Sequence, residues 1–321
     1  MKAAVYYETG KPEVFKYEDR PDPQVGAGSV LIDVKAISIE GGDVLNRAGG
    51  EMSSTPHIVG YQCAGVIREV GSSVTDRSVG QEVVCVMPFG SHAEIVSVAA
   101  MQTFVVPQGL DMQTAACVPI AFGTADDCLF EFGKLQAGEK VLIQAGAGGV
   151  GLAAIQLAKR AGATVLATAG SDEKLERLKE FGLDHGVNYR EGDWVATARQ
   201  LSGGGVNLVV DSVGTTLDGS IAATGYKGRI VVVGNAGRAE NRGVDPAKLS
   251  EMNRSLTGVF FGGALMMESQ RGRPLVEGLL ADVAKGDLRV VIDRTYPLSE
   301  AAAAHSYIES RAVFGRVLMT P

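Results

Sequence analysis

The hexapeptide GAGGVG constrains the fold of this 321-residue chain more than any other stretch. Its glycines Gly146, Gly148 and Gly151 have the spacing G-x-G-x-x-G between an apolar run, KVLIQA, and a helical pattern, GLAAIQLAKRAG. In this context Gly146 permits the tight turn, Gly148 lets a pyrophosphate approach the backbone, and Gly151 allows the helix to pack closely. Gly149 and Val150 complete the helix start, whose positive dipole end faces the phosphates. The stretch therefore predicts a dinucleotide-binding βαβ unit rather than an ordinary structural turn.

The region that follows repeats this alternation of strand and helix. Compact apolar runs, TVLATA, NLVVDSV and RIVVVG, alternate with helical patterns, as in a parallel sheet that is buried on both faces. The segment SDEKLERLKEFG has Ser171 as a helix N-cap, acids in the first turn and Gly182 at the end. SLTGVFFGG, residues 255–263, has the pattern of a last strand. We therefore expect a doubly wound parallel sheet of the Rossmann type.

The sequence on either side of this region has a different character. The first ~120 residues carry short β-rich runs, KAAVYY, SVLIDVKAI, CAGVIREVG and QEVVCVMPFG, separated by Gly, Pro and Asp turns. After Phe261 come a long helix, RPLVEGLLADVAKG, a strand, RVVIDRTYPL, a helix, SEAAAAHSYIESR, and a last strand, GRVLMTP. A length of 321 residues fits about two domains. The chain is thus expected to be an α/β protein with a β-rich domain and a Rossmann domain.

Composition and sequence pattern limit the binding partners and the cellular compartment that can be expected for this chain. A formal charge of −7 makes nucleic acid an unfavourable partner. The N-terminus, MKAAVYYETGKPEVF, lacks the apolar core of a signal peptide, and later apolar stretches are interrupted well short of a membrane span. The cysteines are far apart without a CxxC pair, so we expect four buried thiols: Cys63, Cys85, Cys117 and Cys128. These features predict a cytoplasmic protein that binds no membrane.

The end of the second Rossmann strand selects the dinucleotide. An NAD enzyme presents Asp or Glu to the ribose diol about 20 residues beyond the glycine motif. Here Gly170 and Ser171 occupy that position, and Lys174 lies one helical turn further on, where its ammonium could meet a 2′-phosphate. This pattern favours NADPH over NADH. The alternative is that Lys174 is an ordinary solvated helix residue with no role in cofactor binding.

Several of these stretches together resemble the medium-chain dehydrogenase/reductase superfamily, and within it the zinc-free quinone oxidoreductases related to zeta-crystallin. The likeness runs nearly end to end and is carried by VGYQCAGVIREVGSSVTDRSVGQEV, AACVPIAFGTADDCL, the glycine motif with its flanks, DSVG and ESRAVFGRVLM. It implies a GroES-like catalytic domain at 1–122 and 264–321, an inserted Rossmann domain at 123–263, and a cofactor in the cleft between them. It also implies that the strand at 255–263 pairs across a two-fold axis, which predicts a homodimer.

The same resemblance implies cofactor contacts outside the glycine motif. Lys174 and Tyr189, in VNYRE, would bind the 2′-phosphate of NADPH, and Thr124 would lie near its nicotinamide. Asn235, after the fifth Rossmann strand, and Arg311, in ESRAV, would also contact the cofactor.

The positions that hold the catalytic zinc in zinc-dependent relatives carry Glu40, Tyr61 and Ile120 in this chain. One carboxylate, a phenol and an alkyl group do not make the N/S tetrahedron that zinc prefers, so no metal is expected. His57 and His92 remain in this region, but a single histidine is more often a hydrogen-bonded surface or loop residue than a ligand.

Without a Lewis acid, the expected reaction is hydride transfer from NADPH to a quinone or to the β-carbon of an enone. Tyr61 is then the candidate proton donor, and the alternative is a pocket wall whose hydroxyl is tied to a backbone group. Enoyl thioester reduction and a non-catalytic, crystallin-like role in NADPH binding are the alternative functions. Quinone reductases tend to carry Asn, Tyr, Glu and Tyr where this chain has Glu40, Leu45, Gln62 and Asp126, which leaves the acceptor open.

Overall fold

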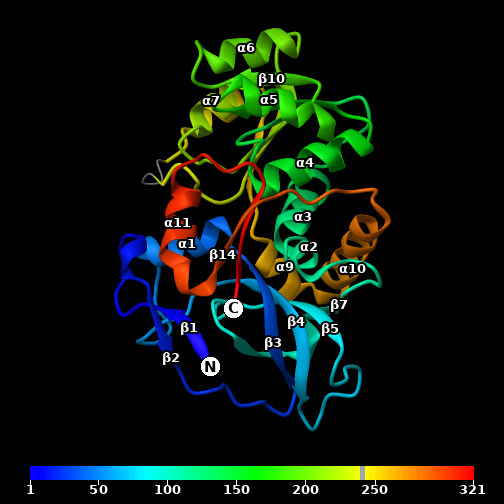
Figure 1. Ribbon diagram of the computed structural model, residues 1–321. Helices are drawn as coiled ribbons and strands as arrows, with labels where there is room; N and C mark the ends of the chain where they lie inside the picture. The colour runs from blue at the N-terminus through cyan, green and yellow to red at the C-terminus, as the bar shows by residue number, and fades with distance from the viewer. Residues whose placement is uncertain (239–242) are drawn as a thin grey trace. The chain divides into compact units, whose positions relative to one another are not determined.

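The computed structural model describes residues 1–238 and 243–321, and contacts within the chain divide it into two compact units (Figure 1). The first unit consists of Met1–Gly123 and Gly262–Pro321, and the second of Thr124–Phe261. The chain therefore leaves the first unit once and returns to it. Across the described ranges, no helix combines the length and the apolar character needed to cross a membrane.

The second unit is built on a parallel sheet of six strands. In sheet order these are β10 (His185–Asn188), β9 (Thr164–Ala169), β8 (Lys140–Ile143), β11 (Val206–Asp211), β12 (Thr224–Val232) and β13 (Ser255–Gly258). Every neighbouring pair in this order is parallel. The chain starts at β8, builds outward to β10, then returns to the middle and builds outward to β13, so the winding reverses between β8 and β11. Ligands of such sheets bind beyond the carboxyl ends of the strands at this reversal.

Helices connect these strands: α4 (Gly149–Arg160), α5 (Asp172–Leu178), α6 (Trp194–Leu201), α7 (Leu217–Ala223) and α8 (Pro246–Ser250). The central strands are buried, and Leu142 of β8 and Val209 of β11 pack into a core with side chains of α6 and α7.

The expected limits of α5 are confirmed. The hydroxyl of Ser171 accepts a hydrogen bond from the backbone N–H of Lys174 at 3.4 Å. After the 3-10 turn Lys179–Phe181, Gly182 ends the segment with a φ of +104°.

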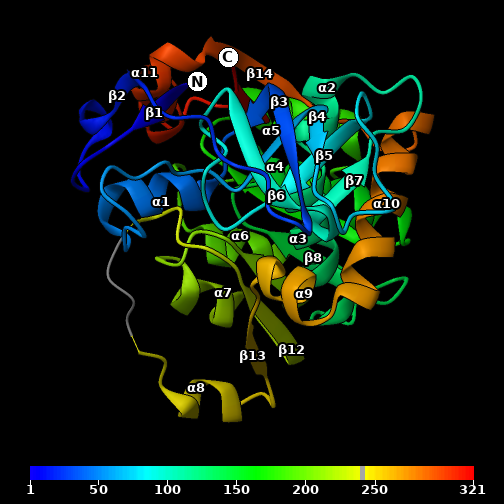
Figure 2. The ribbon, with the colours of Figure 1, turned by 90° about the horizontal axis from the view of Figure 1, so that it is seen from below.

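Two elements differ from their sequence patterns. SLTGVFFGG forms β13 only over Ser255–Gly258, and helix α9 (Phe261–Met267) begins shortly afterwards. β13 is the edge strand beside β12 (Figure 2), and its residues are exposed or half-buried. Helix α10 (Ser269–Lys285) begins before the expected RPLVEGLLADVAKG pattern and carries Pro274 in its second turn, where one internal hydrogen bond is lost.

The first unit contains an antiparallel pair, β1 (Lys2–Val5) with β2 (Lys16–Asp19), and a larger mixed sheet. The larger sheet has the order β14 (Ile292–Pro297), β15 (Arg316–Thr320), β3 (Ser29–Ser38), β4 (Gln62–Val70), β5 (Glu82–Val86) and β7 (Thr103–Val105), with β6 (Ile95–Ala99) also paired to β3. Strands β3, β4 and β5 lie side by side in Figure 1. Further α-helices are α1 (Gly41–Gly49), α2 (Met112–Ala116), α3 (Pro119–Asp126) and α11 (Ala301–Glu309), and a π-helical turn, Asp127–Glu131, continues α3.

The C-terminal strand β15 completes the sheet of the first unit. It pairs antiparallel with the end of β3, with Leu318 opposite Ser38 and Met319 opposite Ile37. The pairing brings the beginning of β15 beside the residues that follow β3, where α1 starts. Side chains 276 residues apart in the sequence therefore meet in one cluster, which is described below.

Candidate active site

The glycine motif forms a tight turn between β8 and α4 in the second unit. The backbone N–H of Gly146 donates to the carbonyl of Thr168 on β9 at 2.8 Å, and that of Gly148 donates to the carbonyl of Ala145 at 3.0 Å. The left-handed residue of this turn is Ala145, with a φ of +52°, so the turn does not take its positive φ from Gly146. Gly146 is required by close packing instead, because a Cβ there would lie 2.8 Å from the Cβ of Ala167.

The start of α4 is open to an anion. A Cβ on Gly151 would lie 2.5 Å from the carbonyl oxygen of Ala145, so only glycine lets the helix begin against the turn. A Cβ on Gly148 would meet one described atom within 4 Å, the same oxygen at 3.4 Å, so the backbone there can be approached closely. The N–H groups of Gly149, Val150 and Gly151 have no intrahelical acceptor. Since the first turn carries no acidic side chain, this helix start fits a pyrophosphate.

A buried polar network behind the turn connects three neighbouring strands. Gln144, after β8, accepts from the hydroxyl of Thr168 at 2.7 Å and donates to the hydroxyl of Ser220 at 3.4 Å. Ser220 donates to the carboxylate of Asp211, at the end of β11, at 2.7 Å. Asp211 also accepts from the backbone N–H of Gly214 at 3.0 Å. The network fixes the glycine turn and the loop after β11 relative to each other, and sequence reasoning missed it because Asp211 stood out only as part of DSVG.

The end of β9 faces hydroxyl and cationic groups. A Cβ on Gly170 would lie 2.7 Å from the hydroxyl oxygen of Tyr189 and 3.3 Å from Nε of Arg190. Ser171 caps α5, and Lys174 is half-buried in the first turn of that helix. The structure therefore brings Gly170, Tyr189 and Arg190 together beside the start of α5. Arg190 is a residue that sequence reasoning missed, although it stands next to Tyr189 in VNYRE.

The remaining expected cofactor residues lie in three different places. Thr124 is buried in α3 and is the first residue of the second unit. Asn235 follows β12, and its Oδ1 lies 2.8 Å from the position of a Cβ on Gly214. Asn235 therefore packs over the loop after β11, near the carboxyl edge of the sheet. Arg311 is an exposed residue of the first unit, shortly after α11, with a φ of +61°.

Glu40 is the centre of a buried polar cluster in the first unit. Its carboxylate accepts two N–H groups of Arg316, one of them at 3.0 Å, and the side-chain amide of Gln62. Arg316 also donates to the hydroxyl of Ser38 at 2.6 Å, and Gln62 accepts the backbone N–H of Ile120 at 3.1 Å. Burial by itself would lower the pKa of Arg316, but the neighbouring carboxylate of Glu40 raises that pKa above its usual value. Both oxygens of Glu40 are thus engaged by its neighbours.

Tyr61 lies half-buried just before β4. Its hydroxyl oxygen accepts a hydrogen bond from the side-chain amide of Asn46, on α1, at 2.9 Å. Burial and the carboxylate of Asp43 raise the pKa of Tyr61 to about 12, and the bond from Asn46 acts in the opposite direction. The phenol is therefore protonated at neutral pH, and its hydroxyl is held by a side chain rather than by a backbone group.

His57 and His92, the two histidines near the expected metal position, are buried in loop segments, and His92 contacts a third buried histidine, His305. His92 and His305 are each 0% exposed, and their Nε2 atoms lie 3.1 Å apart, so one ring donates to the other. His57 is also buried, with its Nδ1 3.2 Å from the hydroxyl of Ser53. The expected loop position of His57 and His92 is confirmed, and aromatic side chains cover these rings, which explains why they are buried. Burial lowers the pKa of His92 to about 3 and, with His92 and Arg47, lowers that of His305 well below its usual value.

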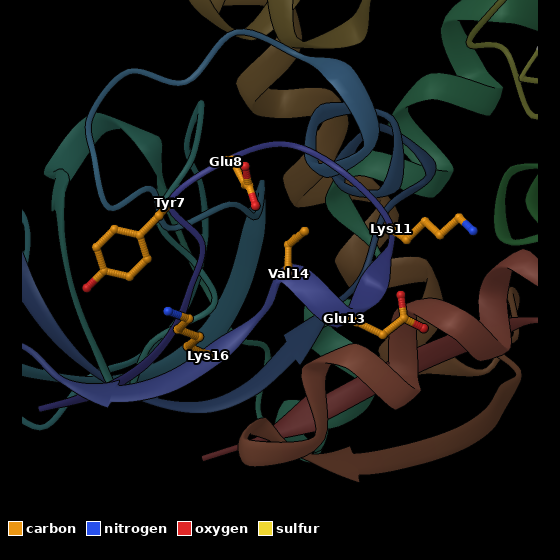
Figure 3. Close-up of a pocket in the computed structure, with 6 residues that line it drawn as sticks. All are labelled: Tyr7, Glu8, Lys11, Glu13, Val14 and Lys16. Carbon is orange, nitrogen blue, oxygen red and sulfur yellow. The ribbon is translucent and has the colours of Figure 1, made fainter.

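A surface pocket of about 300 Å³ lies in the first unit (Figure 3) and is lined by Tyr7, Glu8, Lys11, Glu13, Val14 and Lys16. The ammonium of Lys16 lies over the ring of Tyr7, 4.9 Å from its centroid. The charged side chains around the pocket are of both signs, which favours no ligand of one charge. Of the expected site residues, all of which the structure describes, none lines this pocket.

Two family models match the chain: Alcohol dehydrogenase GroES-like domain over residues 26–108 and Zinc-binding dehydrogenase over residues 149–277. A 2-haloacrylate reductase from a Burkholderia species is 32% identical, with 100% of this chain and 99% of that protein covered. The quinone oxidoreductase of Rattus norvegicus is 30% identical, with 99% and 97% covered. The synaptic vesicle membrane protein VAT-1 homolog of Danio rerio is 31% identical over 93% of this chain, which spans 65% of that relative.

Solved structures have the same fold. The quinone oxidoreductase of Escherichia coli in complex with NADPH matches with a TM-score of 0.94 and 28% identity, covering 100% of both chains. A mycobacterial protein in complex with NADPH matches with a TM-score of 0.93 and 32% identity, again over 100% of both chains. The chain belongs to the zinc-free quinone oxidoreductase family of the medium-chain dehydrogenase/reductase superfamily. The expected fold class, a GroES-like domain combined with a Rossmann domain, is confirmed.

The residues at the expected metal position do not fit zinc, although one matching family model is described as a zinc-binding dehydrogenase. Both oxygens of Glu40 are taken by Arg316 and Gln62, and Ile120 offers no ligand atom. The phenol of Tyr61 has a pKa of about 12, so it is a poor anionic ligand at neutral pH. Among residues 1–238 and 243–321, no three His, Cys, Asp or Glu side chains gather as a metal site.

Proposed function

We propose that this chain uses NADPH to reduce a quinone or the carbon–carbon double bond of an α,β-unsaturated carbonyl compound. The observation that carries the proposal is a pair of sites: a helix start without acidic side chains and open to an anion in the second unit, and a protonated phenol at the expected metal position in the first. Two relatives are a quinone oxidoreductase and a 2-haloacrylate reductase, and both names describe acceptors with an electron-poor double bond. When bound, NADPH supplies the hydride for such an acceptor.

The cofactor would be held mainly by backbone and cationic groups of the second unit. The pyrophosphate would lie against the glycine turn and the first turn of α4, formed by Gly146, Gly148, Gly149, Val150 and Gly151. The 2′-phosphate would lie at Gly170 and Ser171, within reach of Tyr189, Arg190 and Lys174, because hydroxyl and cationic groups suit a dianion. We keep Thr124, Asn235 and Arg311 as further proposed contacts of the cofactor.

Tyr61 would supply the proton in this reaction. An acceptor that gains a hydride at carbon develops negative charge on its oxygen, and that oxyanion needs a donor. The phenol of Tyr61 can donate because its raised pKa keeps it neutral at physiological pH. A readily reduced quinone needs this donor less than an enone, since the quinol anion is delocalised and can take its proton from water.

The proposed activity is tested by mixing the purified chain with NADPH and a panel of quinones, enones and enoyl thioesters, and measuring NADPH consumption. Oxidation that depends on a quinone or an enone is the expected result. Oxidation that depends only on an enoyl thioester would favour that narrower reductase. NADPH binding without turnover for any acceptor would contradict the enzymatic proposal and favour a binding role.

The role of Tyr61 is tested by Tyr61→Phe, which removes the hydroxyl and keeps almost the same volume. Enone turnover should fall about 10²-fold while NADPH affinity is kept, as expected when one positioned acid or oxyanion donor is lost. Quinone turnover should fall less. Equal turnover of the enone by the variant and the wild type would show that the proton comes from elsewhere.

We also propose that the chain forms a homodimer through the edge of the Rossmann sheet. Among the strands that the structure describes, β13 pairs with β12 on one side and has no partner on the other, and such unpaired edges tend to pair with another chain. Phe260, which follows the strand, is 71% exposed, so an apolar group lies next to this edge. Light scattering at micromolar concentration should give the mass of two chains, and a mass of one chain would contradict the proposal.

A further inference from the structure

The hydroxyl of Tyr61 lies against one face of helix α1. The side-chain amide of Asn46 donates to it at 2.9 Å. A Cβ on Gly42 would lie 2.3 Å from Cε2 of Tyr61 and 2.7 Å from its hydroxyl oxygen. Residues four apart share one face of a helix, so Gly42 and Asn46 form a single surface. The glycine lets the ring approach the helix, and the amide fixes the hydroxyl at the end of the ring.

We propose that Asn46 is a positioning residue that makes Tyr61 a proton donor, an inference that rests on the proposed function. The hydroxyl oxygen uses a lone pair to accept the amide N–H, which leaves its own O–H free to point away from α1. Among the residues that the structure describes, Asn46 is the single hydrogen-bond partner of the Tyr61 hydroxyl, and it acts as the donor. No described protein group accepts the proton of this hydroxyl. The proton is therefore available to an acceptor molecule.

The same hydrogen bond stabilises the phenolate that remains after proton transfer. Burial is the main cause of the raised pKa of Tyr61, and the acidic groups facing it, Asp43 of α1 and Glu40 just before it, raise it further, while Tyr61 in turn raises the pKa of Tyr6. The amide of Asn46 lowers the pKa of Tyr61 and so opposes these groups. A hydrogen bond to a charged acceptor is stronger than one to a neutral acceptor, so the contact strengthens as the proton leaves.

The proton balance of the step is simple. The O–H bond of Tyr61 breaks, a new O–H bond forms on the reduced acceptor, and the electron pair of the broken bond remains on the phenolate oxygen. The hydride brings both electrons of the reduction. Water then returns a proton to the phenolate and leaves hydroxide in solution, so no further reductant or oxidant is required.

Two substitutions separate a positioning role from a merely structural one. Asn46→Leu removes the donor, and enone turnover should fall about 5- to 10-fold, as for one lost hydrogen bond of about 1 kcal/mol or slightly more. Asn46→Asp has nearly the same shape but reverses the bond, because its carboxylate accepts the Tyr61 proton and repels the phenolate. Enone turnover should then fall about 10²-fold, close to the effect of Tyr61→Phe. A structural role predicts the opposite order, with the isosteric Asp variant nearest to wild type.

The chain offers a matched control. Asn253 donates to the hydroxyl of Tyr226 at 3.0 Å, in an exposed pair of the same chemistry, and Asn253→Asp should leave turnover unchanged. In the Tyr61→Phe background, neither Asn46 variant should lower turnover further, because two residues that act as a unit are not additive. Fluorine NMR of protein labelled with 3-fluorotyrosine should show a higher pKa for residue 61 in Asn46→Leu, whatever the turnover.

The outcomes distinguish this inference from the proposed function. If the wild type oxidises NADPH with an enone and Asn46→Asp is as fast, the inference is overturned and the reductase remains. If Tyr61→Phe is as fast as the wild type, both the donor role and the role of Asn46 are overturned. If no acceptor supports NADPH oxidation by the wild type, it is the proposed function that has failed, and the NMR measurement still decides whether Asn46 acts on Tyr61.

Discussion

Acidification should destabilise the first unit through the buried pair His92 and His305. Both side chains are 0% exposed, and their Nε2 atoms are 3.1 Å apart. The Nδ1 of His305 has no hydrogen-bond partner among the described residues. A proton added to either ring would place a charge in the core, and would also put two N–H donors face to face if it went to Nε2. The pair therefore remains neutral in the folded chain.

The sign and size of the effect follow from linkage. Burial lowers the folded pKa of His92 to about 3, and that of His305 also lies well below its usual value, whereas both are near 6.5 in an unfolded chain. Below about pH 6.5 the unfolded chain binds protons that the folded chain does not, so the free energy of unfolding falls as the pH falls. His92 contributes about 1.4 kcal/mol per pH unit, which is about 2 kcal/mol at pH 5, and His305 acts in the same direction. This stability is fully present above about pH 6.5.

Glu40 and Asp43 have raised pKa values, caused first by burial, and their titration acts in the opposite direction at lower pH. The assay therefore compares wild type with His92→Gln, which keeps an acceptor for His305 but no longer titrates. Urea unfolding followed by circular dichroism at about pH 7.5 and about pH 5 gives both free energies. The wild type should lose about 2 kcal/mol more than the variant between the two pH values. A difference between the two proteins that does not change with pH would refute the reasoning.

Three further expectations concern cofactor, metal and assembly. Lys174→Ala should weaken NADPH binding by about 1–3 kcal/mol and leave NADH binding unchanged, because one charge-assisted contact is lost; equal wild-type affinities for the two cofactors in titrations would contradict it. Purified protein should hold no stoichiometric zinc, and a chelator should leave its turnover unchanged; elemental analysis that finds about one zinc per chain would overturn this expectation. Leu256→Lys, at a half-buried position of the edge strand β13, should prevent the proposed dimer and give the mass of one chain in light scattering, and a dimer that persists in the variant would place the interface elsewhere.

Much of the second unit could be predicted because its signals are local. The glycine turn, the Ser171 cap and the stop at Gly182 depend on residues within a turn or two of each other, and all three are present in the structure. The length of β13 was not predictable in this way. β13 pairs with β12 up to Gly258 opposite Val232, which is the last residue of β12, so the ladder ends although the apolar pattern of SLTGVFFGG continues.

The contacts of the candidate site could not be predicted from the sequence because the residues that make them are far apart along the chain. Glu40 was visible as a carboxylate at an expected metal position, and a buried carboxylate needs a cation or must be neutral. A cationic partner for Glu40 could therefore be expected, but no sequence pattern near Glu40 shows which of the 30 Lys and Arg residues it is. The selection is made by the pairing of β15 with β3, which joins residues 276 apart. The contact of His92 with His305, on α11, likewise joins residues far apart in the sequence, 213 positions from each other.

This pairing makes a last prediction about how Glu40 and Arg316 contribute to stability. Arg316→Met leaves the carboxylate of Glu40 buried without its cation, and the free energy of unfolding should fall by about 3–5 kcal/mol. Glu40→Gln together with Arg316→Met removes both charges, so the double variant should be more stable than Arg316→Met alone. Urea unfolding of the wild type, both single variants and the double variant gives the coupling free energy. If the double variant is no more stable than Arg316→Met, the loss comes from the packing of the arginine side chain and its bonds to Ser38, and the ion pair is not what sets stability at this position.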